Sequence, residues 1–126
     1  MSYERVEQKD ETDKLVTSSK MTLHWLDTIK SEIKQRVPSL DFNESKYWAS
    51  FRSPETNRNI VYLQPQKSQI RLFVRLNLSY DKNLQQTPSS SNWAEMYPSI
   101  FVIRSKNMIK NAIELIVSSY EYDLQK

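Results

Sequence analysis

The stretch SQIRLFVRLNL, residues 68–78, alternates hydrophobic and other side chains almost without exception. One face of an extended strand would carry Ile70, Leu72, Val74, Leu76 and Leu78. The other face would carry Arg71, Phe73, Arg75 and Asn77. This pattern predicts a sheet with one buried face and one face that could meet a partner.

The flanking sequence predicts a helix, further strands and a closing helix. Apolar residues from Leu23 to Val37 recur at spacings of three and four, which predicts a helix that ends before Pro38. Residues 46–52, 60–63 and 100–104 each predict a short strand, whereas residues 79–99 are rich in Ser, Gln, Asn and Pro and predict a long connection. Ser105 is expected to cap a final helix with an apolar stripe from Ile109 to Tyr120.

The predicted fold class is α+β, in the order α-β-β-β-loop-β-α. Because each helix has one apolar stripe and the main strand has one apolar face, we expect a two-layer fold. In it, an antiparallel sheet of about four strands carries both helices on one face. With 126 residues, the chain predicts a single domain at residues 21–126 after a flexible or partly helical leader at residues 1–20.

The composition excludes several classes of site. The chain has no glycine, which Walker loops, dinucleotide-binding turns and hydrolase nucleophile elbows require, and it has no cysteine for disulfides, thiolate chemistry or cysteine-based zinc sites. His24 is the one histidine, and its helical context favours an ordinary surface role. We therefore expect no metal, no cofactor and no catalytic residues, and the sequence favours a non-catalytic domain over an enzyme.

The charge pattern permits an anionic partner without requiring one. The formal net charge is +3, and residues 1–20 are polar throughout. No apolar run approaches the roughly 20 residues that span a bilayer, so we expect a soluble cytoplasmic protein with no membrane partner.

Two short motifs carry a family resemblance. Pro65, Gln66 and Lys67 lie between two predicted strands, and Ser119, Tyr120 and Glu121 end the final helix. With the hydrophobic pattern of residues 22–121, these motifs resemble the family of small domains of unknown function numbered fifty-six fifty-five in domain collections. The family usually has a glycine-rich turn with histidine and tryptophan where this chain has residues 91–96. The resemblance implies an accessory role, as in members joined to predicted transport proteins or nuclease-like regions.

The candidate binding residues lie on the outward sheet face and in the long connection. They are Trp48, Arg52, Arg71, Phe73, Arg75 and Trp93. Arginines can pair with phosphates while aromatic rings stack on bases, although the same residues could form an ordinary solvated face and Trp93 could fold back over the core. We interpret the chain as an accessory or interaction domain with a protein partner. A nucleic-acid-binding module that uses Arg71, Phe73 and Arg75 is the first alternative, and an accessory part of a nuclease or restriction-like system is the second.

Overall fold

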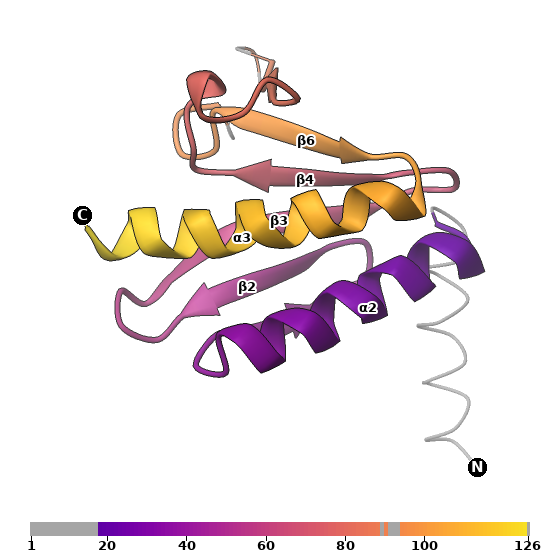
Figure 1. Ribbon diagram of the computed structural model, residues 1–126, viewed down its shortest axis with the longest axis horizontal. Coiled ribbons are helices and arrows are strands. Elements are labelled where there is room, and N and C mark those ends of the chain that lie inside the picture. Colours follow the sequence, from indigo (N-terminus) through magenta and orange to yellow (C-terminus); the bar gives the residue numbers. More distant parts are fainter. Residues whose placement is uncertain (1–17, 89, 91–93, 126) are drawn as a thin grey trace.

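The computed structural model describes residues 18–88, 90 and 94–125, and it shows an α+β fold with two helices and one antiparallel sheet (Figure 1). The predicted leader lies outside the described residues except for residues 18–20. The described elements are, in chain order, α2 (Lys20–Arg36), β1 (Asp41–Glu44), β2 (Ala49–Ser53), β3 (Arg58–Pro65), β4 (Ile70–Val74), β5 (Gln85–Gln86), β6 (Ser99–Ile103) and α3 (Ile109–Leu124).

The sheet has six strands in the order β1-β2-β3-β4-β6-β5, so the expectation of about four strands is corrected. Strand β1 lies in a segment for which no strand was predicted; it pairs with β2, and Phe42 packs on Phe51 of β2 with ring centroids 5.1 Å apart. Strand β5 lies within the expected long connection and pairs with β6 through only Gln85 and Gln86. A strand this short leaves no side-chain period in the sequence.

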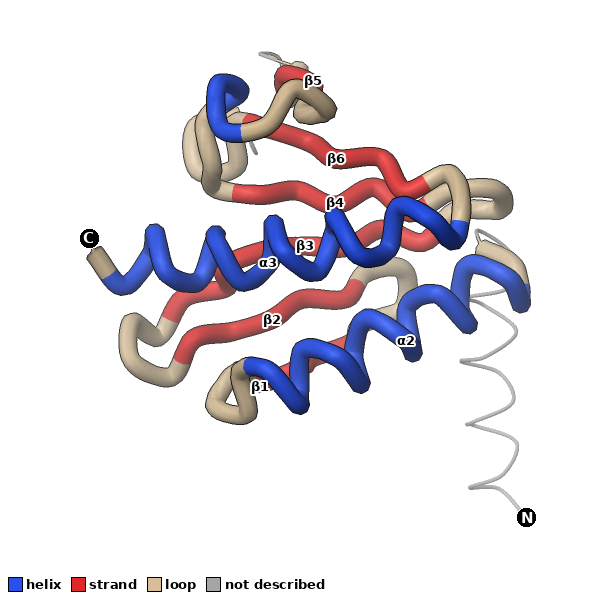
Figure 2. The backbone as a smooth tube through the Cα atoms, in the orientation of Figure 1, coloured by secondary structure: helices blue, strands red, loops and turns tan. Residues whose placement is uncertain are grey.

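Helices α2 and α3 lie together on one face of the sheet (Figure 2). Their apolar stripes meet the buried sides of β2, β3, β4 and β6, and Ile29, Ile33 and Ile116 have no exposed surface. The two-layer expectation is not matched exactly, because a second hydrophobic cluster occupies the opposite face of the sheet. The centre of that face is therefore packed.

The opening stretch forms the middle of the sheet, but it is shorter as a strand than the alternation predicts. Strand β4 ends at Val74, and Leu76 remains buried beyond it. Leu78 begins a 3₁₀ turn and is exposed, so the prediction that it lies on the buried face is wrong. The chain turns away from the strand direction after residue 76, which ends the two-residue period.

The helix ends follow from capping chemistry. The Ser19 hydroxyl accepts a hydrogen bond from the Thr22 amide, and the Thr22 hydroxyl accepts one from the Ser19 amide, which forms a capping box. Helix α2 ends at Arg36 with Val37 as its cap, which confirms the predicted stop before Pro38. Ser105 precedes a 3₁₀ turn rather than capping α3 directly, and α3 begins at Ile109.

The β2–β3 hairpin shows how a chain without glycine makes a tight turn. Asn57 has a φ of 58°, in the left-handed region that glycine usually occupies and that asparagine tolerates best among the other residues. Its side-chain oxygen accepts a hydrogen bond from Arg52. The turn places Thr56 and Arg58 near the end of α3.

Thr22 joins the start of α2 to the β3–β4 turn, because its hydroxyl also donates to the Gln66 carbonyl at 2.8 Å. Thr22→Val keeps the side-chain shape but leaves the Ser19 amide and the Gln66 carbonyl without this partner. We expect the free energy of unfolding in urea to fall by about 1–2 kcal/mol. Thr28→Val is the control, since that hydroxyl bonds only within the helix, to the His24 carbonyl. Equal losses in the two variants would contradict the capping role of Thr22.

Candidate functional site

The face of the sheet opposite the helices carries a cluster of aromatic and aliphatic side chains. The outer aromatic cluster consists of Trp48, Tyr62, Phe73, Tyr97, Ile100 and Val102. The Trp48 and Phe73 ring centroids are 5.6 Å apart, and Tyr62 meets Tyr97 edge to face at 5.2 Å. These contacts have the geometry of favourable aromatic pairs.

Three of the predicted binding residues meet within this cluster. Trp48 packs on Phe73, and the Arg71 guanidinium lies 5.1 Å from the centroid of the same ring. Arg71 also donates to the Gln64 side-chain oxygen at 3.2 Å. The Phe73 residue is only 4% exposed, so its ring contributes to packing and offers a partner little accessible surface.

The other predicted residues lie apart from this group. Arg75 lies beyond the end of β4, where its Nε is 3.7 Å from the Asp123 carboxylate and its side chain is 15% exposed. Arg52 donates to Asn57 in the β2–β3 hairpin. Trp93 lies outside the described residues. The structure therefore does not unite the five described residues of the predicted set in one surface.

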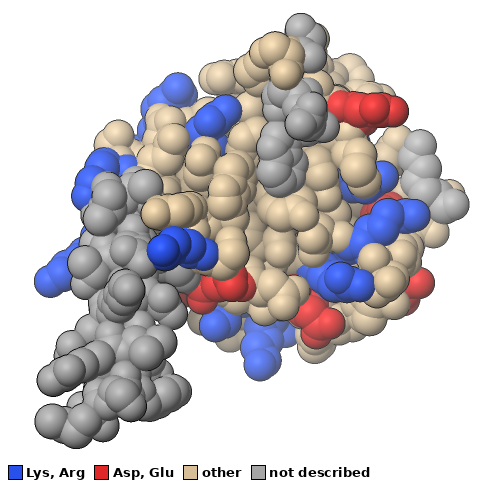
Figure 3. All heavy atoms as spheres, turned by 180° about the vertical axis from the view of Figure 1, so that it is seen from behind, with Lys and Arg blue, Asp and Glu red and all other residues tan. Residues whose placement is uncertain are grey.

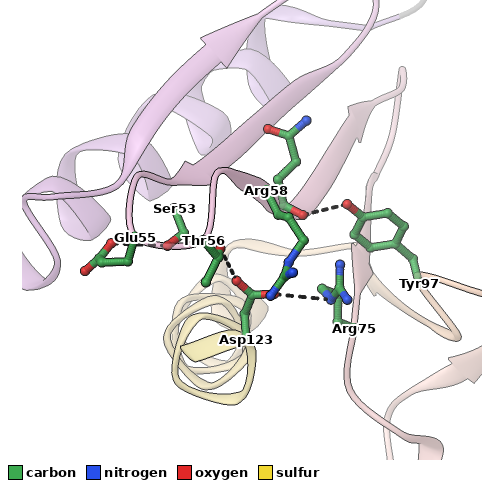
Figure 4. A network of polar contacts seen from close by, with 8 residues as sticks. Ser53, Glu55, Thr56, Arg58, Arg75, Tyr97 and Asp123 are labelled. Carbon is green, nitrogen blue, oxygen red and sulfur yellow. Dashed lines mark hydrogen bonds and ion pairs between the residues drawn. The ribbon is translucent and has the colours of Figure 1, made fainter. Parts of the chain in front are cut away.

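A network of hydrogen bonds and ion pairs surrounds Asp123 near the C-terminal end of α3 (Figure 4). Asp123 has no exposed surface and accepts hydrogen bonds from Arg58 Nε at 3.0 Å and from the Thr56 hydroxyl. Arg75 approaches the same carboxylate from the end of β4, and its guanidinium lies 5.9 Å from the Tyr97 ring centroid. The network thus joins α3, the β2–β3 hairpin and the end of β4.

Neighbouring polar groups are also held by structural contacts. Glu55 accepts hydrogen bonds from Tyr120 and Ser53, and the bond from Tyr120 lowers the pKa of the Glu55 carboxyl while that bond raises the pKa of the Tyr120 hydroxyl. Burial raises the pKa of Tyr97 to about 12, and its hydroxyl donates to the Asn59 carbonyl at 2.6 Å. Each of these pKa shifts moves the group further from neutrality.

A hollow opens beside the outer aromatic cluster, at the end of the sheet where the β1–β2 and β3–β4 connections lie. This tip hollow has a volume of about 670 Å³, within the range of roughly 300–1,000 Å³ that is typical of small-ligand sites. Its described lining residues are Tyr47, Trp48, Gln64, Pro65, Gln66, Lys67, Ser68 and Gln69. Tyr47 is 42% exposed and Trp48 is half-buried, so aromatic surface faces solvent here.

Hydrogen bonds orient the amide groups of the tip hollow. Because Arg71 can only donate, its bond fixes the Gln64 oxygen towards Arg71 and leaves the Gln64 amide nitrogen on the other side. Gln66 and Gln69 are joined at 2.7 Å between their side chains, and their backbones also bond across the turn. The described lining residues include Lys67 and no acidic side chain. The tip hollow therefore combines aromatic surface with hydrogen-bond donors.

Basic side chains surround this end of the molecule. Lys20 starts α2, Lys46 and Lys67 lie in the two strand connections, and Arg104 and Lys106 follow β6; all five are exposed. The acidic residue next to the β1–β2 connection is Glu44, the last residue of β1. Figure 3 shows a largely uncharged middle of the sheet face with Lys and Arg on both sides of it; the connections described here lie on the left side of that view.

The tip hollow and the Asp123 network were not predicted from the sequence, although the sequence contains one feature that points to each of them. Lys67 belongs to the Pro-Gln-Lys motif, but the motif alone does not show that the turn faces Tyr47 and Trp48. Asp123 lies four residues after Ser119 and seven after Ile116, which are both buried, so it continues the buried stripe of α3. A carboxylate on a core stripe indicates a buried polar partner.

Comparisons with family models, with curated proteins and with solved structures give no match. In the described part of the chain, no group of three or more His, Asp or Glu side chains is placed to hold a metal ion. Neither α2 nor α3, within that same part, is long and apolar enough to cross a membrane.

Asp123→Asn tests the network directly. The substitution keeps the shape but removes the charge that faces Arg58 and the largely buried Arg75, so we expect the free energy of unfolding to fall by about 3 kcal/mol. Glu121→Gln, an exposed carboxylate on the same helix, is the matched control and should change stability by less than about 0.5 kcal/mol. Urea unfolding measures both, and an Asp123→Asn protein as stable as the control would show that the network is dispensable.

Proposed function

We propose that the chain is a non-catalytic accessory domain that binds a partner through the tip hollow. The observation that carries this proposal is that Tyr47 and Trp48 line the same open hollow as Gln64, whose side-chain amide is oriented by Arg71. Exposed tyrosine and tryptophan are favoured anchors at binding sites. The centre of the sheet, by contrast, uses its aromatic residues for packing.

The state of the carboxylates supports binding over catalysis. Asp123 bonds to Thr56 and Arg58, and Glu55 bonds to Tyr120 and Ser53. Glu114 pairs with Arg36, and the hydrogen bond from Arg36 lowers the pKa of the Glu114 carboxyl. General acid–base catalysis works best with a pKa near the working pH, whereas the bonds to Glu55 and Glu114 lower the pKa of each of these two carboxyls.

The family resemblance supports an accessory role. Its Pro65, Gln66 and Lys67 motif forms one wall of the tip hollow, and its Ser119, Tyr120 and Glu121 motif lies beside the Asp123 network. Membership of that domain family is part of this proposal. A role next to a nuclease-like or transport protein would suit a small domain that presents one binding hollow.

A small-molecule titration tests the hollow without assuming the class of partner. Benzoate has a planar ring and an acceptor, and cyclohexanecarboxylate has the same charge without the planar face. In ¹⁵N–¹H correlation spectra we expect benzoate to shift the amides of residues 45–48, 64 and 66–69, with a dissociation constant of about 1–10 mM. Cyclohexanecarboxylate should shift them less, because it cannot stack on Tyr47 or Trp48.

Two variants complete this experiment. Tyr47→Ala should abolish the benzoate shifts, whereas Tyr80→Ala should retain them, because Tyr80 is an exposed tyrosine outside the hollow. Benzoate shifts that centre on residues 106–114, or equal shifts with the two acids, would overturn the assignment of the hollow.

A further inference from the structure

We infer that the tip hollow binds single-stranded nucleic acid, with a base stacked on Tyr47 or Trp48 and the phosphates held by the surrounding basic side chains. This inference rests on the proposed function and names the chemistry of the partner. It also moves the nucleic-acid site away from Phe73 and Arg75, which with Arg71 were the residues predicted from the sequence for that alternative, and keeps Arg71 beside the hollow.

The shape and hydrogen bonding of the hollow suit a nucleobase. A base is flat, so it can stack on an exposed aromatic ring, and its edge carries acceptors for donors such as an amide nitrogen. Tyr47 supplies the most exposed aromatic surface, and Gln64 turns its amide nitrogen away from Arg71. These groups share the lining of one hollow.

The charge around the hollow favours a polyanion over an ordinary protein partner. Lys67 lines the hollow, Lys46 lies one residue before Tyr47, and Arg71 is bonded to Gln64 of the lining. Lys20, Arg104 and Lys106 extend the positive charge along the same end of the sheet. A backbone with one negative charge per nucleotide would be attracted to this end of the molecule, because exposed lysines attract phosphates over a range set by the salt concentration.

The packing around Phe73 explains why the strand centre is a poor site. Phe73 is 4% exposed, and Arg75 is directed towards Asp123. Stacking a base there would require Trp48 or the other cluster members to leave Phe73. At the hollow, the exposed part of Tyr47 can be covered without disturbing the core, and single strands present the base faces that a duplex hides.

Fluorescence anisotropy with a labelled single-stranded oligothymidylate of fifteen nucleotides tests this inference. We expect the wild type to bind at low salt and to weaken as salt rises. The double variant Tyr47→Ala, Lys67→Glu should bind on the order of tenfold or more weakly. The matched double variant Tyr80→Ala, Lys82→Glu removes the same kinds of side chain from the exposed β4–β5 connection, and it should bind as the wild type does.

Competitors separate stacking from charge alone. Inorganic polyphosphate and a duplex of the same length should compete less well than the unlabelled single strand. Equal competition by polyphosphate, equal binding by the two double variants, or no binding of the oligothymidylate at low salt would each overturn the inference. If the oligothymidylate does not bind, benzoate shifts at residues 45–48, 64 and 66–69 would leave the proposed function standing, and their absence would overturn both proposals.

Discussion

The pairing of β4 with β3 on one side and β6 on the other is the constraint on which the rest of the structure depends. Because side chains alternate along a strand, this pairing divides the protein into a helix-covered face and an outer face. Ile70, Leu72 and Val74 have no exposed surface on the helix side. A shift of the register by one residue would place Arg71 and Phe73 in the core instead.

The same pairing determines where a partner can bind. It places Phe73 among Trp48, Tyr62 and Ile100, so the apolar side chains in the middle of the outer face pack against one another. Beside this packing, Tyr47 lies in the β1–β2 connection and is exposed. The hydroxyl of Thr22, in the capping box of α2, donates a hydrogen bond to the Gln66 carbonyl and so holds the β3–β4 turn against the start of the helix. The hollow thus depends on the sheet and on α2 together.

The sequence was sufficient for the fold class, since the two helices, β2 and β4 each have a clear apolar period and β3 and β6 are short apolar runs. It was insufficient for β1 and β5, which depend on pairing rather than on a side-chain pattern. It also could not show that Arg75 would turn to Asp123, 48 residues away in the chain. The alternation correctly predicted that Arg71 and Phe73 share one face of β4. The exposure of Phe73 to solvent depends on neighbours that are distant in the sequence, so the alternation could not predict it.

Photochemical cross-linking tests the central claim, that a base stacks at Tyr47 or Trp48, most directly. An oligonucleotide that carries 5-iodouracil would be irradiated with the protein, and the attached tryptic peptide would be identified by mass spectrometry. The predicted adduct lies on the peptide YWASFR, residues 47–52, at Tyr47 or Trp48. An adduct on LFVR, residues 72–75, would place the base at the strand centre and contradict the account.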